Sequence, residues 1–243
     1  MSNILKKFYS NDSKRFWETD RSLDGRDRDV YNLLSEKSGV VLEYGCGCGS
    51  LLYNICLQDR FSQCYGFDLS EELISKIQSA WSSNNPNKTS KMKVAIPEND
   101  TMPDIADKTI DVVICVATLE HVVNPYIILD ELFRVSKNDA VFVCSVPNYA
   151  YVKHRVEIML GKQPKTGTDC PVEQWREVGW DGMHVHTFTK SSFSILLADC
   201  GWKPIIWRGS GTRFNSLGLW LLRKHFPGFW SGELMVMCSK NQQ

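Results

Sequence analysis

VVLEYGCGCG, residues 40–49, begins as an apolar, β-branched run and ends in glycines at alternate positions. Such a run is typical of a buried strand, and the glycines after it predict a turn whose backbone carries few side chains. Glycine admits positive φ and leaves room for a ligand against the main chain, while residues 50–57 are expected to turn helical. The stretch therefore predicts a strand, a nucleotide-type binding loop and a helix.

The spacing of the glycines separates two classes of nucleotide site. A dinucleotide-binding fingerprint carries glycine or alanine at its sixth position, where this chain has Ser50. This difference disfavours a nicotinamide-dependent oxidoreductase. A glycine triplet is also compatible with a plain tight turn, so the interpretation depends on a second strand at the right distance.

That second strand is QCYGFD, residues 63–68. It ends in Asp68, about 20 residues beyond the glycine loop, where nucleotide-binding α/β units place a carboxylate that binds ribose. A carboxylate there accepts charge-assisted hydrogen bonds from both ribose hydroxyls. The alternative is that Asp68 lies near the positive end of a helix opened by residues 70–73. We favour ribose binding, with Leu69 packed against the adenine.

A third element is IDVVICVATLEHV, residues 110–122, which is almost unbroken in its apolar character. A run of this kind is typical of a central strand buried on both faces of a parallel sheet. Ligands of such sheets gather at the carboxyl ends of the strands. We therefore expect Val116, Ala117 and the Leu-Glu-His segment 119–121 at the ligand site.

Together, these elements resemble the class I S-adenosylmethionine-dependent methyltransferases. Glu43-x-Gly45-x-Gly47-x-Gly49 is similar to the first motif of that family, and residues 119–122 are similar to a stretch in its small-molecule branch. The resemblance implies S-adenosylmethionine as cofactor and S-adenosylhomocysteine as product, with Glu43 orienting the amino group of the cofactor. The cofactor-binding residues that it implies are Glu43, Tyr44, Gly45, Cys46, Gly47, Gly49, Asp68, Leu69, Asn99, Asp100, Val116, Ala117 and Arg26.

Two parts of this assignment leave alternatives open. Met102-Pro103 takes the place of a Leu-Pro pair in relatives, so Glu98 or Asp100 is expected to accept a hydrogen bond from the adenine amino group. A solvated turn over residues 97–100 is the alternative. Near the N-terminus, Arg26 is expected to pair with the cofactor carboxylate, and the residues expected to help cover the cofactor are Tyr9, Trp17 and Arg21.

Residues 146–201 resemble a methyltransferase branch that includes ubiquinone-pathway O-methyltransferases and the methionine-biosynthesis MetW proteins. The resemblance implies methyl transfer to oxygen or nitrogen of a small-molecule acceptor, or alternatively a regulatory role through a partner enzyme. Trp175 and Trp180 are expected to close the acceptor pocket.

His184 and His186 alternate, so in an extended segment they point the same way, and we expect them to form a polar strap or to take a general role in the pocket. Binding a metal or presenting a base to the acceptor is the alternative for this pair. For the aromatic and basic stretch over 149–155, surface cations are the alternative to binding an acceptor. The residues expected to bind the acceptor are Tyr149, Tyr151, Arg155, His184 and His186.

Methyl transfer mainly requires alignment of the acceptor and exclusion of water. A general base is needed only where the acceptor starts protonated. His121 is the candidate catalytic residue, because its imidazole titrates near neutrality and follows the strand end. A histidine hydrogen-bonded to backbone is the alternative.

No metal is expected. Ubiquinone-type relatives hold a metal in a Glu-x-x-Glu-His cluster, but here Ala117 takes the place of the first Glu before Glu120 and His121. Glu120 is then expected to be a structural acceptor. Cys46 and Cys48 stand one residue apart with no second pair at zinc-finger spacing, so they do not predict a zinc site.

The composition predicts a single-domain, cytoplasmic enzyme. With 243 residues, 43% hydrophobic, 23% charged and zero formal net charge, the chain can build a large core and shows no basic excess for nucleic acid. No apolar run is long enough to cross a membrane, and residues 1–8 lack a signal-peptide core. Nine cysteines, mostly in apolar strands, indicate buried thiols in a reducing compartment. A homodimer is left open.

Strand and helix patterns alternate along the chain, which predicts a doubly wound parallel sheet. The family resemblance implies a Rossmann-like sheet of seven strands, near residues 39–44, 63–68, 92–96, 110–117, 141–146, 203–208 and 232–238. We expect a single methyltransferase domain over residues 1–243, divided into a helical flank at 1–38, a cofactor-binding core at 39–148, a substrate cap at 149–190, and a C-terminal helix with strands at 191–243.

Overall fold

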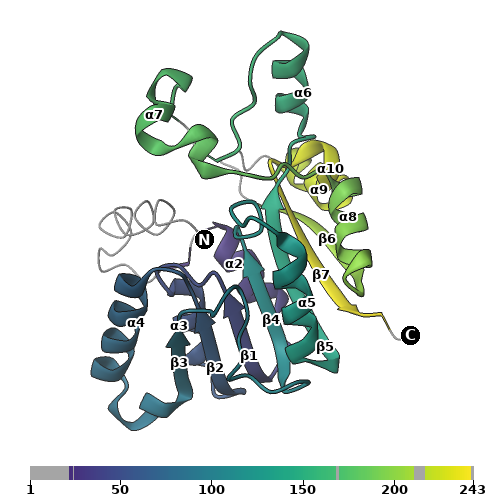
Figure 1. Cartoon of the computed structure of the whole chain (residues 1–243). Helices are drawn as coiled ribbons and strands as arrows, with labels where there is room; N and C mark the ends of the chain where they lie inside the picture. The colour runs from purple at the N-terminus through teal and green to yellow at the C-terminus, as the bar shows by residue number, and fades with distance from the viewer. Residues whose placement is uncertain (1–21, 24, 168–169, 211–216, 242–243) are drawn as a thin grey trace.

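The computed structural model describes residues 22–23, 25–167, 170–210 and 217–241 of the chain. Its centre is one seven-stranded sheet with the strand order β3-β2-β1-β4-β5-β7-β6 (Figure 1). The seven-stranded Rossmann-like prediction is therefore confirmed. The strands are β1 (Gly39–Tyr44), β2 (Phe61–Phe67), β3 (Met92–Ala95), β4 (Ile110–Val116), β5 (Ser136–Pro147), β6 (Trp202–Ser210) and β7 (Glu233–Lys240).

The direction of β7 corrects the prediction of a wholly parallel sheet. β7 runs antiparallel to both of its neighbours, and Glu233 at its start pairs with Pro147 and Ser210 at the carboxyl ends of β5 and β6. The connection from β6 is made by α9 (Leu217–His225) and α10 (Pro227–Trp230). Because β7 begins at the edge where β6 ends, it can only run back through the sheet.

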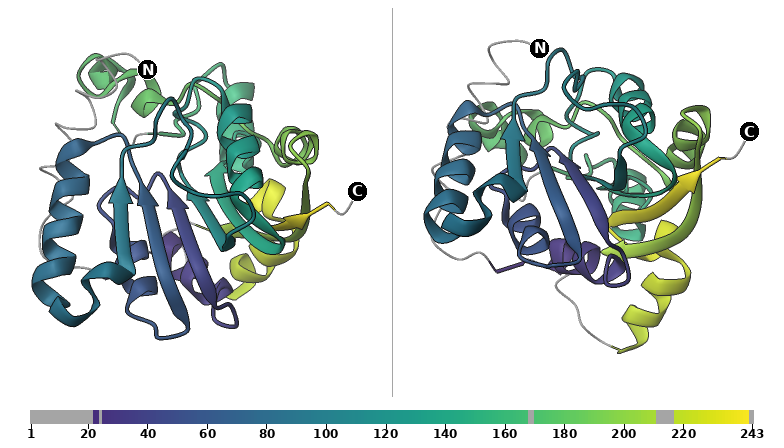
Figure 2. Two further views of the ribbon diagram at one scale, coloured as in Figure 1. Left: turned by 60° about the horizontal axis from the view of Figure 1, so that its bottom comes forward. Right: turned by 90° about the horizontal axis from the view of Figure 1, so that it is seen from below.

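Helices cover both faces of the sheet (Figures 1 and 2). One face carries α2 (Gly25–Leu33), α3 (Ser50–Cys56) and α4 (Glu71–Asn84), and the other carries α5 (Pro125–Val135) and α8 (Lys190–Asp199). The short 3-10 helix η1 (Pro86–Lys91) leads into β3. This is the two-sided cover that a buried parallel sheet requires.

The two cores use alternate residues of the same strands. Val41 of β1 and Val112 of β4 pack with the helices α2 to α4, whereas Leu42 and Val113 pack with α5 and α8. Successive side chains of a strand point to opposite faces, so an apolar run fills both cores at once. The unbroken apolar pattern of these strands is explained by this arrangement.

Local signals fix the ends of the helices. The side chain of Ser70 accepts a hydrogen bond from Leu73 N at the start of α4, and Asn124 does the same for Tyr126 N at the start of α5. The predicted helix over 191–200 is α8, and Gly201 follows it with φ of 79°. The helical flank predicted at 1–38 contains α2, while Tyr9, Trp17 and Arg21, which were expected to help cover the cofactor, lie outside the described residues.

Between β5 and α8, the chain forms a cap that lies beyond the carboxyl ends of the central strands (Figure 1). None of its helices is long, which is why the sequence shows no sustained periodicity there. Among the residues that the structure describes, no helix is long and apolar enough to span a membrane. The cap helices are α6 (Val152–Met159), η2 (Val172–Gln174), α7 (Trp175–Val178) and η3 (Trp180–Met183).

Candidate functional site

The glycine loop joins β1 to α3 across the end of β2. The amides of Gly45 and Cys46 both donate to the carbonyl of Phe67, at 2.7 and 3.0 Å, and Gly49 N donates to Cys46 O at 2.8 Å. Gly45, Gly47 and Gly49 all have positive φ, at 76°, 51° and 76°. These angles are costly for other residues, so the loop conformation itself explains the glycines.

The three glycines differ in what a side chain would meet. A Cβ on Gly45 would lie 2.1 Å from Thr118 Oγ1, and one on Gly49 would lie 2.9 Å from Ile77 Cγ1. A Cβ on Gly47 would meet nothing within 4 Å among the described residues. Gly45 and Gly49 are therefore required for packing within the protein, whereas Gly47 leaves its backbone open to a ligand.

Asp68 ties the glycine loop to the start of α4. Its Oδ2 accepts a hydrogen bond from Gly47 N at 2.9 Å, and its Oδ1 accepts one from Ser70 N at 3.0 Å. Burial raises the pKa of Asp68, while these backbone amides act in the opposite direction. Each oxygen has a further lone pair, so the carboxylate can hold the loop and accept from a ligand as well. Leu69, beside it, is half-buried.

Glu43 lies at the carboxyl end of β1 and is 4% exposed. Its Oε2 accepts no hydrogen bond from the part of the chain that the structure describes. Burial and the nearby charge of Asp27 raise the pKa of Glu43 well above its ordinary value. Arg26 lies close by, with Nε 3.6 Å from Asp27 Oδ1 and 3.7 Å from Glu233 Oε1. Buried carboxylate oxygens normally have a partner, so Glu43 is suited to a donor brought by a ligand.

The segment expected to contact adenine forms a tight turn. Asn99 and Asp100 have positive φ of 48° and 64°, between Glu98 and Thr101, whose backbones exchange hydrogen bonds of 2.9 Å. Tyr44 Oη donates to Asp100 Oδ1 at 3.2 Å. The expected turn and the expected Asp100 site therefore coincide, and Tyr44 connects them to the end of β1.

After β4 the chain bends sharply away from the sheet. Ala117 has φ of 48°, and its amide still donates to Ser145 O of β5 at 3.1 Å. The hydroxyl of Thr118 donates to Val116 O at 2.9 Å. This bend directs Glu120 and the residue after it toward the cap. The packing of Thr118 under Gly45 also brings the bend against the glycine loop.

The two thiols of the glycine loop have different surroundings. Cys46 is buried, and burial raises its pKa well above the ordinary value, so it remains a neutral thiol. Cys48 is half-buried, with Sγ 3.2 Å from Ser50 Oγ. Both are free cysteines.

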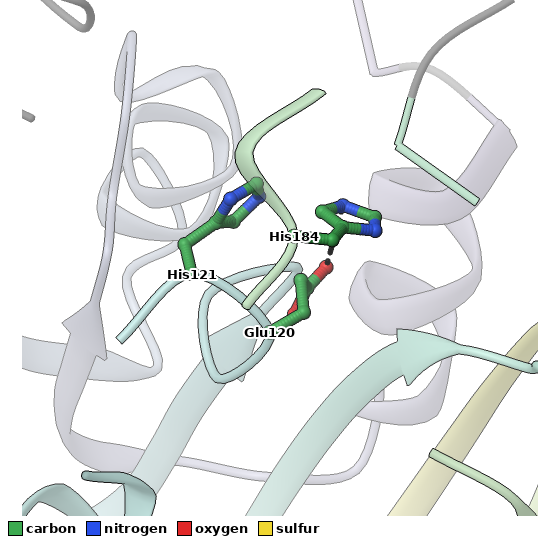
Figure 3. A group of neighbouring side chains, drawn as sticks. All are labelled: Glu120, His121 and His184. Carbon is green, nitrogen blue, oxygen red and sulfur yellow. Dashed lines mark ion pairs between the residues drawn. The ribbon is translucent and has the colours of Figure 1, made fainter. Parts of the chain in front are cut away.

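Glu120, His121 and His184 form a cluster beneath the cap (Figure 3). One potential ligand atom of each lies within 4.8 Å of the others, and Glu120 Oε1 is 4.0 Å from His184 Nε2. The two imidazole rings meet edge to face with centroids 4.7 Å apart. The side chains of Glu120 and His184 are 1% and 6% exposed. The side chains of Glu120 and His184 are therefore shielded from solvent, whereas His121 is half-buried.

The sequence placed Glu120 beside His121 but gave no sign that His184 joins them. The link is made by backbone, because Val185 N and His186 N donate to Glu120 O at 2.7 and 3.1 Å. These bonds tie the cap to the bend after β4. A contact of this kind depends on carbonyl and amide positions that every residue carries, so no side-chain pattern reveals it.

Hydrogen bonds identify the tautomers of the two histidines. His121 Nδ1 lies 3.2 Å from the carbonyl of Met183, which can only accept, so Nδ1 carries the hydrogen and Nε2 the lone pair. His184 Nδ1 lies 2.8 Å from Thr166 Oγ1, whose own hydrogen goes to Asp181 Oδ2 at 2.6 Å. Thr166 must therefore accept from His184, and Nε2 of His184 also carries a lone pair. Thr166 and Asp181 were not foreseen from the sequence.

Burial sets the protonation of the cluster. It lowers the pKa of His121, and together with the neighbouring His121 it lowers the pKa of His184 to about 4. Burial also raises the pKa of Glu120 to about 8. All three side chains are consequently uncharged near neutral pH.

The side chains of the other residues expected to bind an acceptor have partners outside this cluster. His186 Nε2 lies 3.3 Å from Val123 O, so His184 and His186 have different partners despite their alternation. Tyr149 N donates to Phe188 O. On the α6 side, the ring of Tyr151 lies 5.4 Å from the ring of the buried His154, and the exposed Arg155 lies over the ring of Phe229.

The two tryptophans of the cap also differ. Trp175 is 2% exposed and donates from Nε1 to Cys170 O at 3.2 Å, whereas Trp180 is 68% exposed. Their rings meet edge to face with centroids 5.1 Å apart. Trp175 therefore forms the core of the cap, and Trp180 covers it from outside.

Comparison with known proteins agrees with this geometry. A family model described as a methyltransferase domain matches residues 18–205. An S-adenosylmethionine-dependent methyltransferase structure from Aquifex aeolicus is 18% identical, with a TM-score of 0.61 over 94% of this chain and 97% of that one. One from Clostridium acetobutylicum is 13% identical, with a TM-score of 0.61 over 99% of this chain and 100% of that one.

A third structure is the complex of the Haloferax volcanii Trm112 methyltransferase activator with a methyltransferase, which is 14% identical, with a TM-score of 0.61 over 98% of this chain and 96% of that one. At these identities the likeness concerns the fold. No curated protein sequence matches the chain.

Proposed function

This chain belongs to the methyltransferase-domain family, and we propose that it transfers a methyl group from S-adenosylmethionine to an oxygen or nitrogen atom of a small-molecule acceptor. The class I fold and the expected cofactor agree with the family and with the S-adenosylmethionine-dependent structures that share this fold. The observation that carries the proposal is the hydrogen bond between Gly47 N and Asp68, which joins the open backbone of the glycine loop to a carboxylate.

The residues of this site suit the cofactor. Among the described residues, no atom beyond its chain neighbours lies within 4 Å of where a Cβ on Gly47 would stand, and none donates a hydrogen bond to the buried Oε2 of Glu43. We propose that Glu43 accepts from the amino group of the cofactor and that Asp68 accepts from its ribose hydroxyls. When bound, S-adenosylmethionine supplies a methyl group on a sulfonium that leaves readily. Arg26, which lies beside Asp27 and Glu233, is proposed to face the cofactor carboxylate.

The remaining cofactor residues lie at the carboxyl edge of the sheet. We propose that Leu69 packs against the adenine. The Asn99–Asp100 turn, which is held by the hydrogen bond from Tyr44, is proposed to accept a hydrogen bond from the adenine amino group. The other main-chain contacts are proposed to come from Gly45, Cys46, Gly49, Val116 and Ala117.

The acceptor is proposed to lie between the glycine loop and the cap, next to the cluster of Glu120, His121 and His184. His121 is neutral, and its Nε2 carries a lone pair, so it can take the proton of an acceptor that starts protonated. His184, His186 and Tyr149 border the junction of cap and sheet and are proposed to contact the acceptor. Tyr151, at the start of α6, and Arg155, within it, are proposed to contact the acceptor from the cap.

A regulatory role through a partner enzyme is the second candidate. Met159 and Leu160 at the end of α6 are 85% and 66% exposed, and exposed apolar residues that cluster indicate a contact surface. The Haloferax volcanii methyltransferase of the same fold is solved with an activator protein. In this candidate, the fold would bind the cofactor but its output would be the partner's activity.

Product formation separates the two candidates. The purified chain would be incubated with S-adenosylmethionine and fractions of a small-molecule extract, and S-adenosylhomocysteine would be measured by mass spectrometry. We expect turnover with at least one fraction and a loss of about 100-fold or more in His121→Ala, in line with the removal of a general base. His225→Ala, an exposed histidine on α9, is the matched control and should leave turnover unchanged.

Absence of product would decide against catalysis. If every fraction fails to give S-adenosylhomocysteine while the chain still binds it, the catalytic proposal is wrong and the regulatory candidate replaces it. Unchanged turnover in His121→Ala would remove His121 alone from the mechanism.

A further inference from the structure

The cluster of Glu120, His121 and His184 has features that binding of the methyl donor does not require. Two of its members follow β4, and the third comes from the cap (Figure 3). It is the one group of at least three potential ligand side chains of this kind in the part of the chain that the structure describes. A buried glutamate grouped with two imidazoles, one of them half-buried, calls for a chemical explanation.

We propose that Glu120, His121 and His184 bind a divalent transition-metal ion of the zinc type. Imidazole nitrogen suits zinc, cobalt, iron and nickel, and the combination of two histidines with one glutamate is a known zinc ligand set. Magnesium and calcium instead prefer oxygen ligands throughout. The ligand chemistry therefore selects a first-row transition metal.

The spacing of the ligand atoms is suitable. Zinc binds nitrogen and oxygen ligands at about 2.0–2.2 Å in a tetrahedral arrangement, so two ligand atoms on one ion lie about 3.4 Å apart. Glu120 Oε1 and His184 Nε2 are already 4.0 Å apart. All three ligand atoms lie within 4.8 Å of one another, so each pair must approach by no more than about 1.4 Å to reach that tetrahedral separation. Small side-chain rotations would close the set around one ion.

The second layer of residues orients His184 as a ligand. A metal-binding histidine usually donates its other ring N–H to a protein acceptor, which fixes its orientation. His184 Nδ1 donates to Thr166 Oγ1, and Thr166 donates to Asp181, whose carboxylate also accepts from Gly167 N at 3.1 Å. This chain of hydrogen bonds leaves the Nε2 lone pair of His184 on the side of Glu120.

Glu120 gives an independent reason for an ion. Its side chain is 1% exposed, and its Oε2 accepts no hydrogen bond from the described residues. Nε2 of His184, which carries a lone pair rather than a hydrogen, lies 4.0 Å from the other oxygen of Glu120, Oε1. The buried Oε2 therefore lacks a donor, and Oε1 faces an imidazole lone pair. A metal ion bound between the two side chains, in place of the proton of Glu120, would give both a partner.

This inference reverses the expectation of no metal, which depended on Ala117 in the place of a glutamate. His184, from a distant part of the chain, provides a third ligand. Three protein ligands leave coordination positions open, as in catalytic metal sites. One consequence rests on the proposed function: an open position beside the glycine loop would hold an acceptor oxygen and lower the pKa of its hydroxyl. Nε2 of His121 would then be a ligand, and the acceptor would be methylated on oxygen.

The test is metal binding alone, without cofactor or acceptor. The chain would be freed of metal by a chelator and titrated with Zn²⁺ and Co²⁺ in a calorimeter, with the visible absorption of Co²⁺ recorded. We expect one ion per chain, weaker binding of Mg²⁺, and a loss of affinity of more than about 100-fold in Glu120→Gln and His184→Ala, since removing even an outer partner costs 10–100-fold. His225→Ala, at an exposed histidine of α9, is the matched control and should bind like wild type.

Thr166→Val provides a variant that keeps all three ligands. It removes the acceptor of His184 Nδ1, so we expect affinity to fall by about 10–100-fold. A thermal melt of each metal-free variant shows whether it folds. The proposal is overturned if the folded wild type binds neither Zn²⁺ nor Co²⁺ at micromolar concentrations, or if Glu120→Gln and His184→Ala bind them as wild type does. Because no cofactor is present, a failure here leaves the methyl-transfer proposal standing, and the reverse is also true.

Discussion

Gly47 N donates a 2.9 Å hydrogen bond to Oδ2 of Asp68, and this bond joins the ends of two neighbouring parallel strands. The same carboxylate accepts from Ser70 N at the start of α4. Asp68, which is expected to bind ribose, therefore holds the loop of Gly47 and the start of α4 in fixed positions relative to each other. Changes to either residue should affect ligand binding, but through different physical effects.

Gly45→Ala and Gly47→Ala should separate folding from binding. Both glycines have positive φ, which costs alanine about 1–2 kcal/mol, but only at Gly45 would the new Cβ collide with Thr118, at 2.1 Å. We expect Gly45→Ala to lower the free energy of unfolding by more than Gly47→Ala. Gly47→Ala should instead weaken S-adenosylhomocysteine binding by at least about tenfold, because a methyl group then occupies the open backbone. Urea denaturation and calorimetry give the two quantities, and equal effects of both variants on stability would contradict this packing argument.

Glu131→Gln should make the protein less stable above pH 5 or so. Glu131 accepts from Met102 N at 2.6 Å and from Arg134 Nε at 2.7 Å, and these bonds lower its pKa. A carboxyl whose folded pKa is lowered contributes stability above its unfolded pKa of about 4.3, and that contribution disappears as the pH falls through the folded value. We expect a loss of about 1–3 kcal/mol at pH 7 that shrinks toward zero in acid. Denaturation at several pH values measures it, with the exposed Glu173→Gln as control.

Asn148→Asp should be more destabilising than Asn148→Ala. Asn148 is fully buried, and its Nδ2 donates to Ser231 O at 2.8 Å and to Gly228 O at 3.1 Å. Alanine leaves these carbonyls without a donor, whereas aspartate places a buried negative charge against them. We expect a loss of about 2–4 kcal/mol for alanine from these bonds, and a larger loss for aspartate. Chemical denaturation at pH 7 would contradict the assignment if aspartate were tolerated as well as alanine.

Much of this fold follows from local pattern. Successive residues of the apolar runs that include Val41 and Val112 pack into two different cores. Such runs can be buried completely only in a sheet that is covered on both faces. The direction of β7 does not follow, because strand composition is the same in either direction. It is decided by where α9 and α10 end, next to the carboxyl ends of β5 and β6.

The cofactor side of the site was predictable for a similar reason. Gly47 and Asp68 end neighbouring parallel strands, so their spacing along the chain fixes their meeting at one edge. His184 could not be placed in this way, because the cap has no regular pairing with the sheet. Its position depends on backbone bonds to Glu120 O and on Thr166 and Asp181, which carry no motif.

The alternative role of Asp68, a partner for the start of α4, has its own matched control. Ser70 caps α4 by accepting from Leu73 N at 3.3 Å. Ser70→Ala should lower stability by about 1 kcal/mol without removing the carboxylate. If Asp68 did no more than stabilise the start of α4, then Asp68→Ala and Ser70→Ala would have similar effects on ligand affinity.

The most direct measurement is therefore calorimetric titration of wild type, Asp68→Ala and Ser70→Ala with S-adenosylhomocysteine, with NAD as the control ligand. Two charge-assisted hydrogen bonds of about 1.5–3 kcal/mol each predict a loss of more than about 100-fold in Asp68→Ala. Wild type and Ser70→Ala should bind S-adenosylhomocysteine, and none of the proteins should bind NAD. If wild type does not bind S-adenosylhomocysteine, or if Asp68→Ala binds it as tightly as wild type does, this account of the glycine loop and Asp68 is contradicted.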